Sequence, residues 1–153
     1  MPSYFFDSSA LVKNYVQETG TAWVRALIAA KPTNEVITAL VTGPEIVAAL
    51  TRRVRIGLTT QTDATTAINA FRYDFQAQYK PISISPNIVL QAMTLAERHG
   101  LRGYDSIQLA CAVTINAGLI VGSLMPPTFI SADAALNEAA TSEGLLVDNP
   151  NNH

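Results

Sequence analysis

The sequence has little cysteine and histidine, two side chains that serve as nucleophiles or general bases in enzymes. Its 153 residues include one cysteine, Cys111, and two histidines, His99 and His153. A single cysteine cannot form an internal disulfide, which favours a reducing compartment. Cys111 stands between alanines, so we expect a buried structural thiol there. Serine–histidine and cysteine–histidine mechanisms have little to work with in this chain.

Charged side chains are also scarce, at 14% of the residues against 48% hydrophobic ones, and this balance excludes a disordered chain. The net charge is −2, whereas nucleic-acid binders are usually basic. Any contact with RNA would therefore need a local basic patch. Arg53 is the candidate within the one basic cluster, whose other members, Arg52 and Arg55, fit a solvated helix face. Lys13 and Arg102 are further candidates for phosphate contact.

No long uninterrupted apolar run, repeat, linker or low-complexity tract is present. Residues 107–127 are apolar, but polar side chains such as Gln108 interrupt them, so we expect a buried helix plus a loop rather than a membrane span. No signal peptide is visible before the first apolar run. We expect a soluble, cytoplasmic protein with one domain over residues 1–150 and a loose polar tail at residues 151–153.

Short apolar runs alternate with longer helical patterns along the chain. Such alternation predicts an α/β fold in which a mostly parallel central sheet is covered by helices on both faces, a three-layer α/β/α sandwich. We expect strands at residues 4–6, 35–39, 81–85, 128–131 and 145–147, helices at 8–18, around 23–28, at 42–56, 59–78, 86–99, 104–117 and 134–143, and a turn at 31–34.

Four of the twelve acidic residues stand where a helix is expected to begin. Asp7 follows the first strand, Glu45 lies in the first turn after the second, and Asp133 follows the strand at 128–131. The carboxyl ends of parallel strands share one edge of a sheet, and ligands bind in the crevice there. These three acids should therefore meet at that edge, and Asp105 should reach it from the start of its own helix.

Helix capping is the alternative explanation, and for each acid taken singly it is the stronger one. Acids are favoured at helix N-termini by capping hydrogen bonds and by the helix dipole. Thr42 and Glu45, with Pro44 near the helix start, fit a capping box. Asp105 fits this explanation least, because it heads a helix that otherwise belongs to the core, where an unpaired charge is costly.

Convergence of the four acids would call for a cation. Two carboxylates about 4 Å apart repel by roughly 4 kcal/mol at an effective dielectric of 20. Either a divalent ion is bound or some pKa values rise. Oxygen ligands favour Mg²⁺ or Mn²⁺, and such a site can activate water for in-line attack on a phosphodiester, leaving a 5′-phosphate and a 3′-hydroxyl.

Four segments resemble, in order and at similar spacing, the motifs of the PIN-domain family, and the resemblance covers nearly the whole chain. The third segment is the most specific. The segments are Phe6–Lys13 with Tyr15, Glu45 with Ala48–Leu50 and Arg53, Leu101–Ala110, and Phe129–Asp133 with Leu136, Ala139–Ala140, Gly144–Leu145 and Asn149–Pro150.

The resemblance implies a Mg²⁺- or Mn²⁺-dependent endoribonuclease of the VapC toxin type, blocked by a cognate antitoxin protein and forming a homodimer. It implies that Ser9 and Ser131 assist the site as polar or phosphate contacts, and that the metal-binding and catalytic acids are Asp7, Glu45, Asp105 and Asp133. In one departure from the pattern, Gly43-Pro44 precedes Glu45, where relatives often carry a polar or basic residue.

Two other functions remain open at this point. One is a PIN-like RNA- or protein-binding module without catalysis. The other is a phosphoacceptor domain that uses Asp7, although such sites commonly need a lysine late in the chain and the last lysine here is Lys80.

Overall fold

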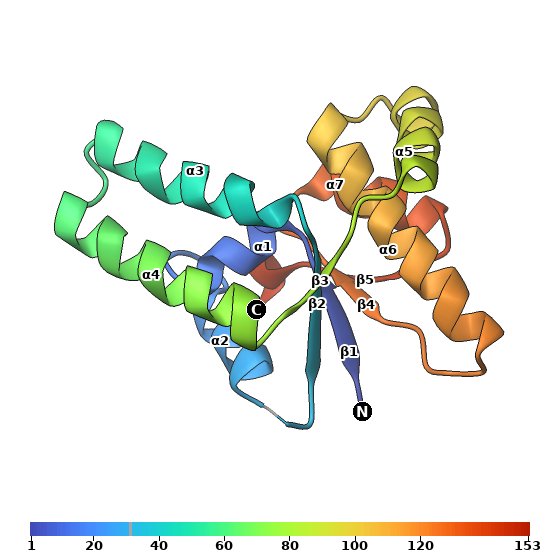
Figure 1. Cartoon of the computed structure of the whole chain (residues 1–153), viewed down its shortest axis with the longest axis horizontal. Coiled ribbons are helices and arrows are strands. Elements are labelled where there is room, and N and C mark those ends of the chain that lie inside the picture. Colours follow the sequence, from blue (N-terminus) through green and yellow to red (C-terminus); the bar gives the residue numbers. More distant parts are fainter. Residues whose placement is uncertain (31) are drawn as a thin grey trace.

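The central element of the structure is a five-stranded sheet in which every pair of neighbouring strands is parallel (Figure 1). The computed structural model describes residues 1–30 and 32–153; Lys31, part of the expected turn at 31–34, lies outside them. The strand order β3-β2-β1-β4-β5 puts β1 in the middle. The strands are β1 (Ser3–Phe6), β2 (Glu35–Ala39), β3 (Lys80–Ile82), β4 (Thr128–Ile130) and β5 (Leu146–Asp148).

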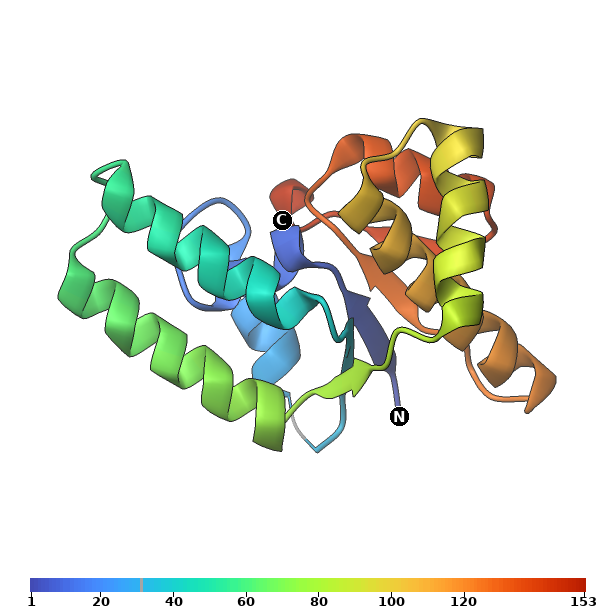
Figure 2. The ribbon, with the colours of Figure 1, turned by 45° about the horizontal axis from the view of Figure 1, so that its top comes forward.

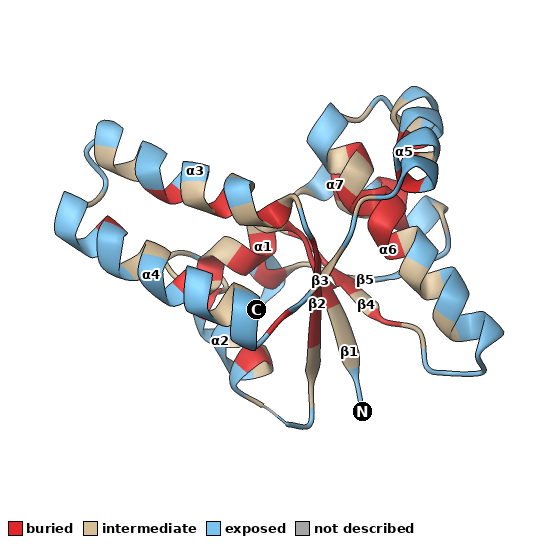
Figure 3. Cartoon of the chain, viewed as in Figure 1, coloured by how far each residue is buried: buried red, intermediate tan, exposed pale blue. Residues whose placement is uncertain are grey.

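Helices cover both faces of the sheet, which confirms the expected three-layer α/β/α sandwich (Figures 1 and 2). The first four helices pack on one face and the last three on the other. Figure 3 shows the buried residues on the helix sides that face the sheet. The helices are α1 (Ser8–Leu11), the 3-10 turn η1 (Val12–Asn14), α2 (Thr21–Ala29), α3 (Thr42–Arg55), α4 (Gln61–Ala77), α5 (Pro86–His99), α6 (Gly103–Val121), α7 (Ala134–Ser142) and the 3-10 turn η2 (Pro150–Asn152).

Strand β1 contributes to both cores because successive side chains point to opposite faces of a sheet. Phe5 belongs to the core under α5–α7, where its ring stacks on Phe129 with centroids 5.8 Å apart. Phe6 belongs to the core under α1–α4 together with Ile130. Both phenylalanines of β1 are fully buried, so the strand that leads into Asp7 is firmly held.

The helix expected at residues 8–18 is shorter in the structure, since α1 and η1 end at Asn14. Side-chain contacts of Lys13 and Tyr15 are made where the helix has ended. The Lys13 ammonium is buried and donates to the Glu18 carboxylate at 2.9 Å and to the Thr19 carbonyl at 2.8 Å. The Tyr15 hydroxyl donates to Asp74 on α4 at 2.8 Å. These contacts require the chain to turn back after η1.

The capping box expected at Thr42 and Glu45 is absent. Thr42 is the first residue of α3, and the preceding Val41 makes no side-chain cap. The Thr42 hydroxyl is buried and instead accepts hydrogen bonds from Thr38 at 2.9 Å and from Gln108 at 2.8 Å. The Thr42 hydroxyl is therefore engaged with the sheet and with α6 and does not form the cap.

The C-terminal residues, expected to be a loose tail, form η2 and contact α2. The His153 ring stacks on Trp23 with centroids 4.1 Å apart, and its Nε2 lies 2.9 Å from the Asp148 carboxylate. Gly20, with φ +84°, brings the backbone against Pro150. An added Cβ at Gly20 would lie 2.3 Å from the Pro150 carbonyl oxygen. The stacking of His153 on Trp23 and the close approach of Gly20 to Pro150 hold the C-terminal segment in place, although its polar composition predicted a loose tail.

Gly20→Ala is expected to destabilise the protein by roughly 1–3 kcal/mol more than Gly144→Ala. Both glycines have left-handed backbone, with φ +84° and +85°, so both variants carry the same local strain. A Cβ at Gly144 meets no heavy atom within 4 Å, whereas one at Gly20 must displace η2. Urea unfolding measures the difference, and equal losses would contradict the packing of η2 on Gly20.

Helix α6 is long and apolar enough, by length and composition, to cross a membrane, as are many core helices of soluble proteins, and it is the one such helix among the described residues. Its first half is buried from Gln108 to Ala112, as expected for a core helix. Its second half and the loop that follows are more open, with Ile120, Val121, Leu124 and Met125 exposed.

Candidate functional site

The four candidate acids lie at the carboxyl edge of the sheet. Asp7 directly follows β1, Asp133 follows β4, and Glu45 lies in the first turn of α3, after β2. Asp105 lies in the first turn of α6. Burial is the main cause that raises the pKa values of Asp7, Glu45 and Asp105; the charge of Asp105 adds to it at Asp7 and Glu45, and the charge of Asp133 adds to it at Asp105. Asp105 is therefore the acid to which the other three are electrostatically coupled.

Asp7 is the most buried of the four, with 3% of its surface exposed. Its Oδ1 accepts the Ala10 backbone N–H at 2.9 Å, which caps α1. The Ser9 hydroxyl lies 2.8 and 3.0 Å from the two carboxylate oxygens, and the Ser131 hydroxyl donates to Oδ2 at 2.7 Å. Burial outweighs these hydrogen bonds and raises the pKa of Asp7 to about 7. A cation beside this carboxylate would favour its ionised form.

Asp133 caps α7, since its Oδ1 accepts the Leu136 backbone N–H at 3.0 Å. Its own backbone N–H donates to the Ser131 hydroxyl at 3.1 Å, so Ser131 links Asp133 to Asp7. The capping explanation thus holds for Asp7 and Asp133, but a cap and a ligand are not exclusive roles because one oxygen of each carboxylate suffices for the cap.

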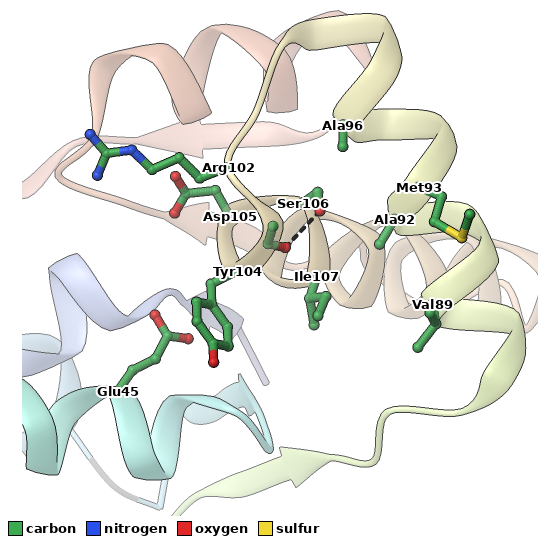
Figure 4. Close-up of a pocket in the computed structure, with 11 residues that line it drawn as sticks. Glu45, Val89, Ala92, Met93, Ala96, Arg102, Tyr104, Asp105, Ser106 and Ile107 are labelled. Carbon is green, nitrogen blue, oxygen red and sulfur yellow. Dashed lines mark hydrogen bonds between the residues drawn. The ribbon is translucent and has the colours of Figure 1, made fainter.

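Asp105 makes no cap, because Arg102 occupies the N-cap position of α6. Its side chain is half-buried. Burial raises the pKa of Asp105, the charge of Asp133 raises it further, and the nearby Arg102 guanidinium lowers it. Figure 4 shows Arg102 extending past the Asp105 carboxylate. The capping explanation therefore does not apply to Asp105.

Glu45 is held by Gln108, a residue that the sequence marked only as polar within an apolar segment. The Gln108 amide nitrogen lies 3.0 Å from the Glu45 carboxylate, 2.8 Å from the Thr42 hydroxyl and 3.0 Å from the Ser8 hydroxyl. Burial raises the pKa of Glu45, and hydrogen bonds from Gln108 and Ser8 oppose that rise. A fully buried glutamine on a core helix was the signal that could have identified this positioning residue.

Gln108→Met is expected to lower the free energy of unfolding by about 1–3 kcal/mol, because it removes the donor that Glu45, Thr42 and Ser8 share. Gln91→Met is the matched control: Gln91 accepts a hydrogen bond from Thr114 at 2.9 Å in an exposed setting, and its loss should cost less than about 0.5 kcal/mol. Chemical unfolding compares the two, and equal losses would argue against the network around Gln108.

The donor set fits a hard divalent cation, although no three metal-ligating side chains among the described residues are close enough to form a ready-made cluster. All four acids offer carboxylate oxygens, the donors that Mg²⁺ and Mn²⁺ prefer. Mg²⁺ usually keeps several waters and is held by only one or two carboxylates. Burial raises the pKa values of Asp7, Glu45 and Asp105, and a bound cation would favour their ionised forms.

Arg53, expected to contact RNA, is not brought to the acids. It lies near the end of α3, eight residues or about 12 Å of helix rise beyond Glu45. Its guanidinium approaches the Glu18 carboxylate at 3.7 Å, and Glu18 also pairs with Lys13 at 2.9 Å. Arg102 is the cation that stands beside an acid of the site.

The remaining groups that could carry other chemistry are engaged elsewhere. His99 Nε2 lies 2.7 Å from Glu143, and Cys111 is fully buried, which raises the pKa of its thiol to about 11. Lys80 pairs with Glu35 where β3 and β2 begin, at the edge opposite Asp7. A phosphoacceptor site around Asp7 therefore has no support from this lysine.

The PIN domain family matches residues 4–140 of the chain, a span that contains all four acids. The chain belongs to this family.

Relatives and solved structures agree with that membership. Over 122 residues the chain is 32% identical to Ribonuclease VapC45 of Mycobacterium tuberculosis (strain CDC 1551 / Oshkosh), which covers 79% of this chain and 83% of the relative. The fold is similar to that in VapBC2 of Rickettsia felis bound to a promoter DNA fragment, with a TM-score of 0.62, 12% identity, and coverage of 96% and 98%. It is also similar to PAE2754 of Pyrobaculum aerophilum, with a TM-score of 0.60, 18% identity, and coverage of 95% and 89%.

Proposed function

We propose that this protein is a metal-dependent endoribonuclease, the toxin of a toxin–antitoxin pair, and that it cleaves RNA with Mg²⁺ or Mn²⁺ at the carboxyl edge of the sheet. The observation that carries the proposal is the position of Asp7, Glu45, Asp105 and Asp133 at the carboxyl edge of the sheet within a PIN domain. The name of a relative that is 32% identical supports RNA as the substrate class.

Each acid has a distinct role in this proposal. Asp7 and Asp105 would hold the divalent ion, and Glu45 and Asp133 would complete the site. When bound, the ion would lower the pKa of a bound water and would stabilise the negative charge on the phosphate. Ser9 and Ser131 fix the Asp7 carboxylate by hydrogen bonds, and Gln108 fixes Glu45 in the same way. No side chain needs to act as a covalent nucleophile.

A cognate antitoxin protein is the proposed partner, supported by the fold shared with a VapBC structure. A homodimer and a cytoplasmic location complete the proposal. Light scattering of the purified protein tests the dimer, and a strictly monomeric profile would count against it.

The experiment that tests the activity is cleavage of an RNA panel with Mg²⁺, with Mn²⁺ and with EDTA. We expect cleavage with either ion and none with EDTA. RNA that stays intact under all conditions but still binds to the protein would instead identify a non-catalytic binding module.

A further inference from the structure

A pocket of about 620 Å³ opens between α5 and α6 and shares part of its lining with the acidic site. Figure 4 shows this α5–α6 pocket, with Glu45 and Asp105 on one side. Val89 and Met93 of α5 and Ile107 of α6 supply apolar lining. Its volume lies within the range of about 300–1,000 Å³ that is typical of sites for small molecules. A molecule in the pocket would therefore lie directly beside the two acids.

Tyr104 is the aromatic side chain of this pocket. It immediately precedes Asp105 in the first turn of α6, and 62% of its surface is exposed. Figure 4 places its ring between Glu45 and Ile107. Exposed aromatic rings bind nucleic-acid bases by stacking, and such stacking tolerates any base because every base has a π-face.

The charges around the pocket agree with a nucleotide as its occupant. Arg102 lines the pocket, and Figure 4 shows its guanidinium beside Asp105 on the side away from the apolar lining, so a cation suited to a phosphate lies next to the acids. The other lining residues supply little that could read the hydrogen-bonding edge of a base: they are mainly apolar, and the Ser106 hydroxyl already donates to the Gly103 carbonyl at 2.7 Å. The pocket is built for ring contact rather than for base-edge recognition.

We propose that the α5–α6 pocket binds the RNA base next to the cleaved phosphate, with Tyr104 as the stacking platform and Arg102 as the phosphate contact. This inference rests on the proposed ribonuclease function. Because the pocket contacts the base through ring stacking rather than hydrogen bonding, we expect it to accept any of the four bases.

The first test compares kcat/KM for RNA cleavage by Tyr104 variants. Tyr104→Ala is expected to lose about 5- to 100-fold, the equivalent of one stacked base, whereas Tyr104→Phe keeps the ring and should stay near the wild-type value. Tyr73→Ala on α4 is the matched control, since Tyr73 is 64% exposed and does not line the pocket. Equal activity of Tyr104→Ala and wild type would overturn the proposal and would leave the pocket to a protein partner.

A second pair of variants fills the pocket without disturbing the core. Gly103 lines the pocket, and a Cβ added there meets no heavy atom within 4 Å; the same space surrounds Gly118 further along α6. Gly103→Leu should reduce kcat/KM, whereas Gly118→Leu should not. Similar values for both variants would contradict a base in the pocket.

An abasic substitution scanned along a cleaved RNA locates the base. At one position next to the cleaved phosphate, the abasic RNA should lower kcat/KM for the wild type, and Tyr104→Ala should cause no further loss on that RNA. Losses that multiply at every position would overturn the pairing of Tyr104 with a base. A wild type that cleaves no RNA would instead refute the ribonuclease function.

Binding supplies a readout that does not depend on catalysis. Fluorescence anisotropy of a labelled RNA tetranucleotide, measured in the Asp7→Asn background, should give a Kd about 5- to 100-fold higher when Tyr104→Ala is added. An unchanged Kd would overturn the stacking role of Tyr104 even if cleavage were altered.

Discussion

Asp105→Asn is expected to reduce RNA cleavage by at least about 10²–10³-fold while the protein stays folded. Removing one donor that stabilises a developing charge already costs that much, and loss of a bound metal should cost no less. Asp105 lies in the first turn of α6 and lines the pocket together with Glu45, so its carboxylate is accessible to a bound ion. Single-turnover cleavage with saturating Mn²⁺ measures the effect, and circular dichroism checks the fold.

Asp63→Asn is the control for this variant. Asp63 is exposed in the first turn of α4, as Asp105 is partly exposed in the first turn of α6. A general effect of helix-terminal charge would appear in both variants. Comparable losses in both, or full activity of Asp105→Asn, would contradict the assignment of Asp105.

The metal-free protein is expected to lose stability as the pH rises from about 4 to about 7. Burial raises the pKa of Asp7 from 3.8 to about 7 in the folded state. Below the unfolded-state pKa both states are protonated and Asp7 contributes nothing to the pH dependence. Above it, the unfolded chain releases the proton first, so stability falls until the folded pKa is passed. The full effect is roughly 4 kcal/mol, at 1.36 kcal/mol per pKa unit.

Asp7→Asn should remove most of this pH dependence and make the metal-free protein more stable than the wild type at pH values above about 7. Adding divalent ions should stabilise the wild type at such pH values and should leave the stability of Asp7→Asn nearly unchanged. Urea unfolding across the pH range, with EDTA or with Mg²⁺, measures both effects. A wild type whose stability is independent of pH would contradict the burial of an uncompensated carboxyl group.

The fold could be predicted from the sequence because its strands and helices follow strong local patterns. Strand β2 and helix α5 have the predicted bounds, and parallel order alone brings Asp7 and Asp133 to one edge. The early end of the first helix could not be foreseen. It depends on the contact of Tyr15 with Asp74 on α4 and on the turn in which Lys13 pairs with Glu18, and local helix propensity does not report those.

The site could be predicted only in part for the same reason. The acids stand at helix starts that a sequence can reveal, but the glutamine that holds Glu45 comes from a helix more than sixty residues away. Arg53 lies on the helix that carries Glu45, but near its far end, where it approaches Glu18; its contact with RNA stays a prediction. Two residues on the same long helix can therefore lie far apart, so a shared helix does not place both of them at the site.

Analysis of the RNA ends produced by Mn²⁺-supported cleavage tests the central claim most directly. Cleavage by an activated water leaves a 5′-phosphate and a 3′-hydroxyl, and it should persist when the 2′-hydroxyl at the cleaved linkage is replaced by hydrogen. A 2′,3′-cyclic phosphate, or loss of cleavage on that deoxy-substituted RNA, would show that the RNA's own hydroxyl attacks and would contradict hydrolysis at the site of Asp7, Glu45, Asp105 and Asp133.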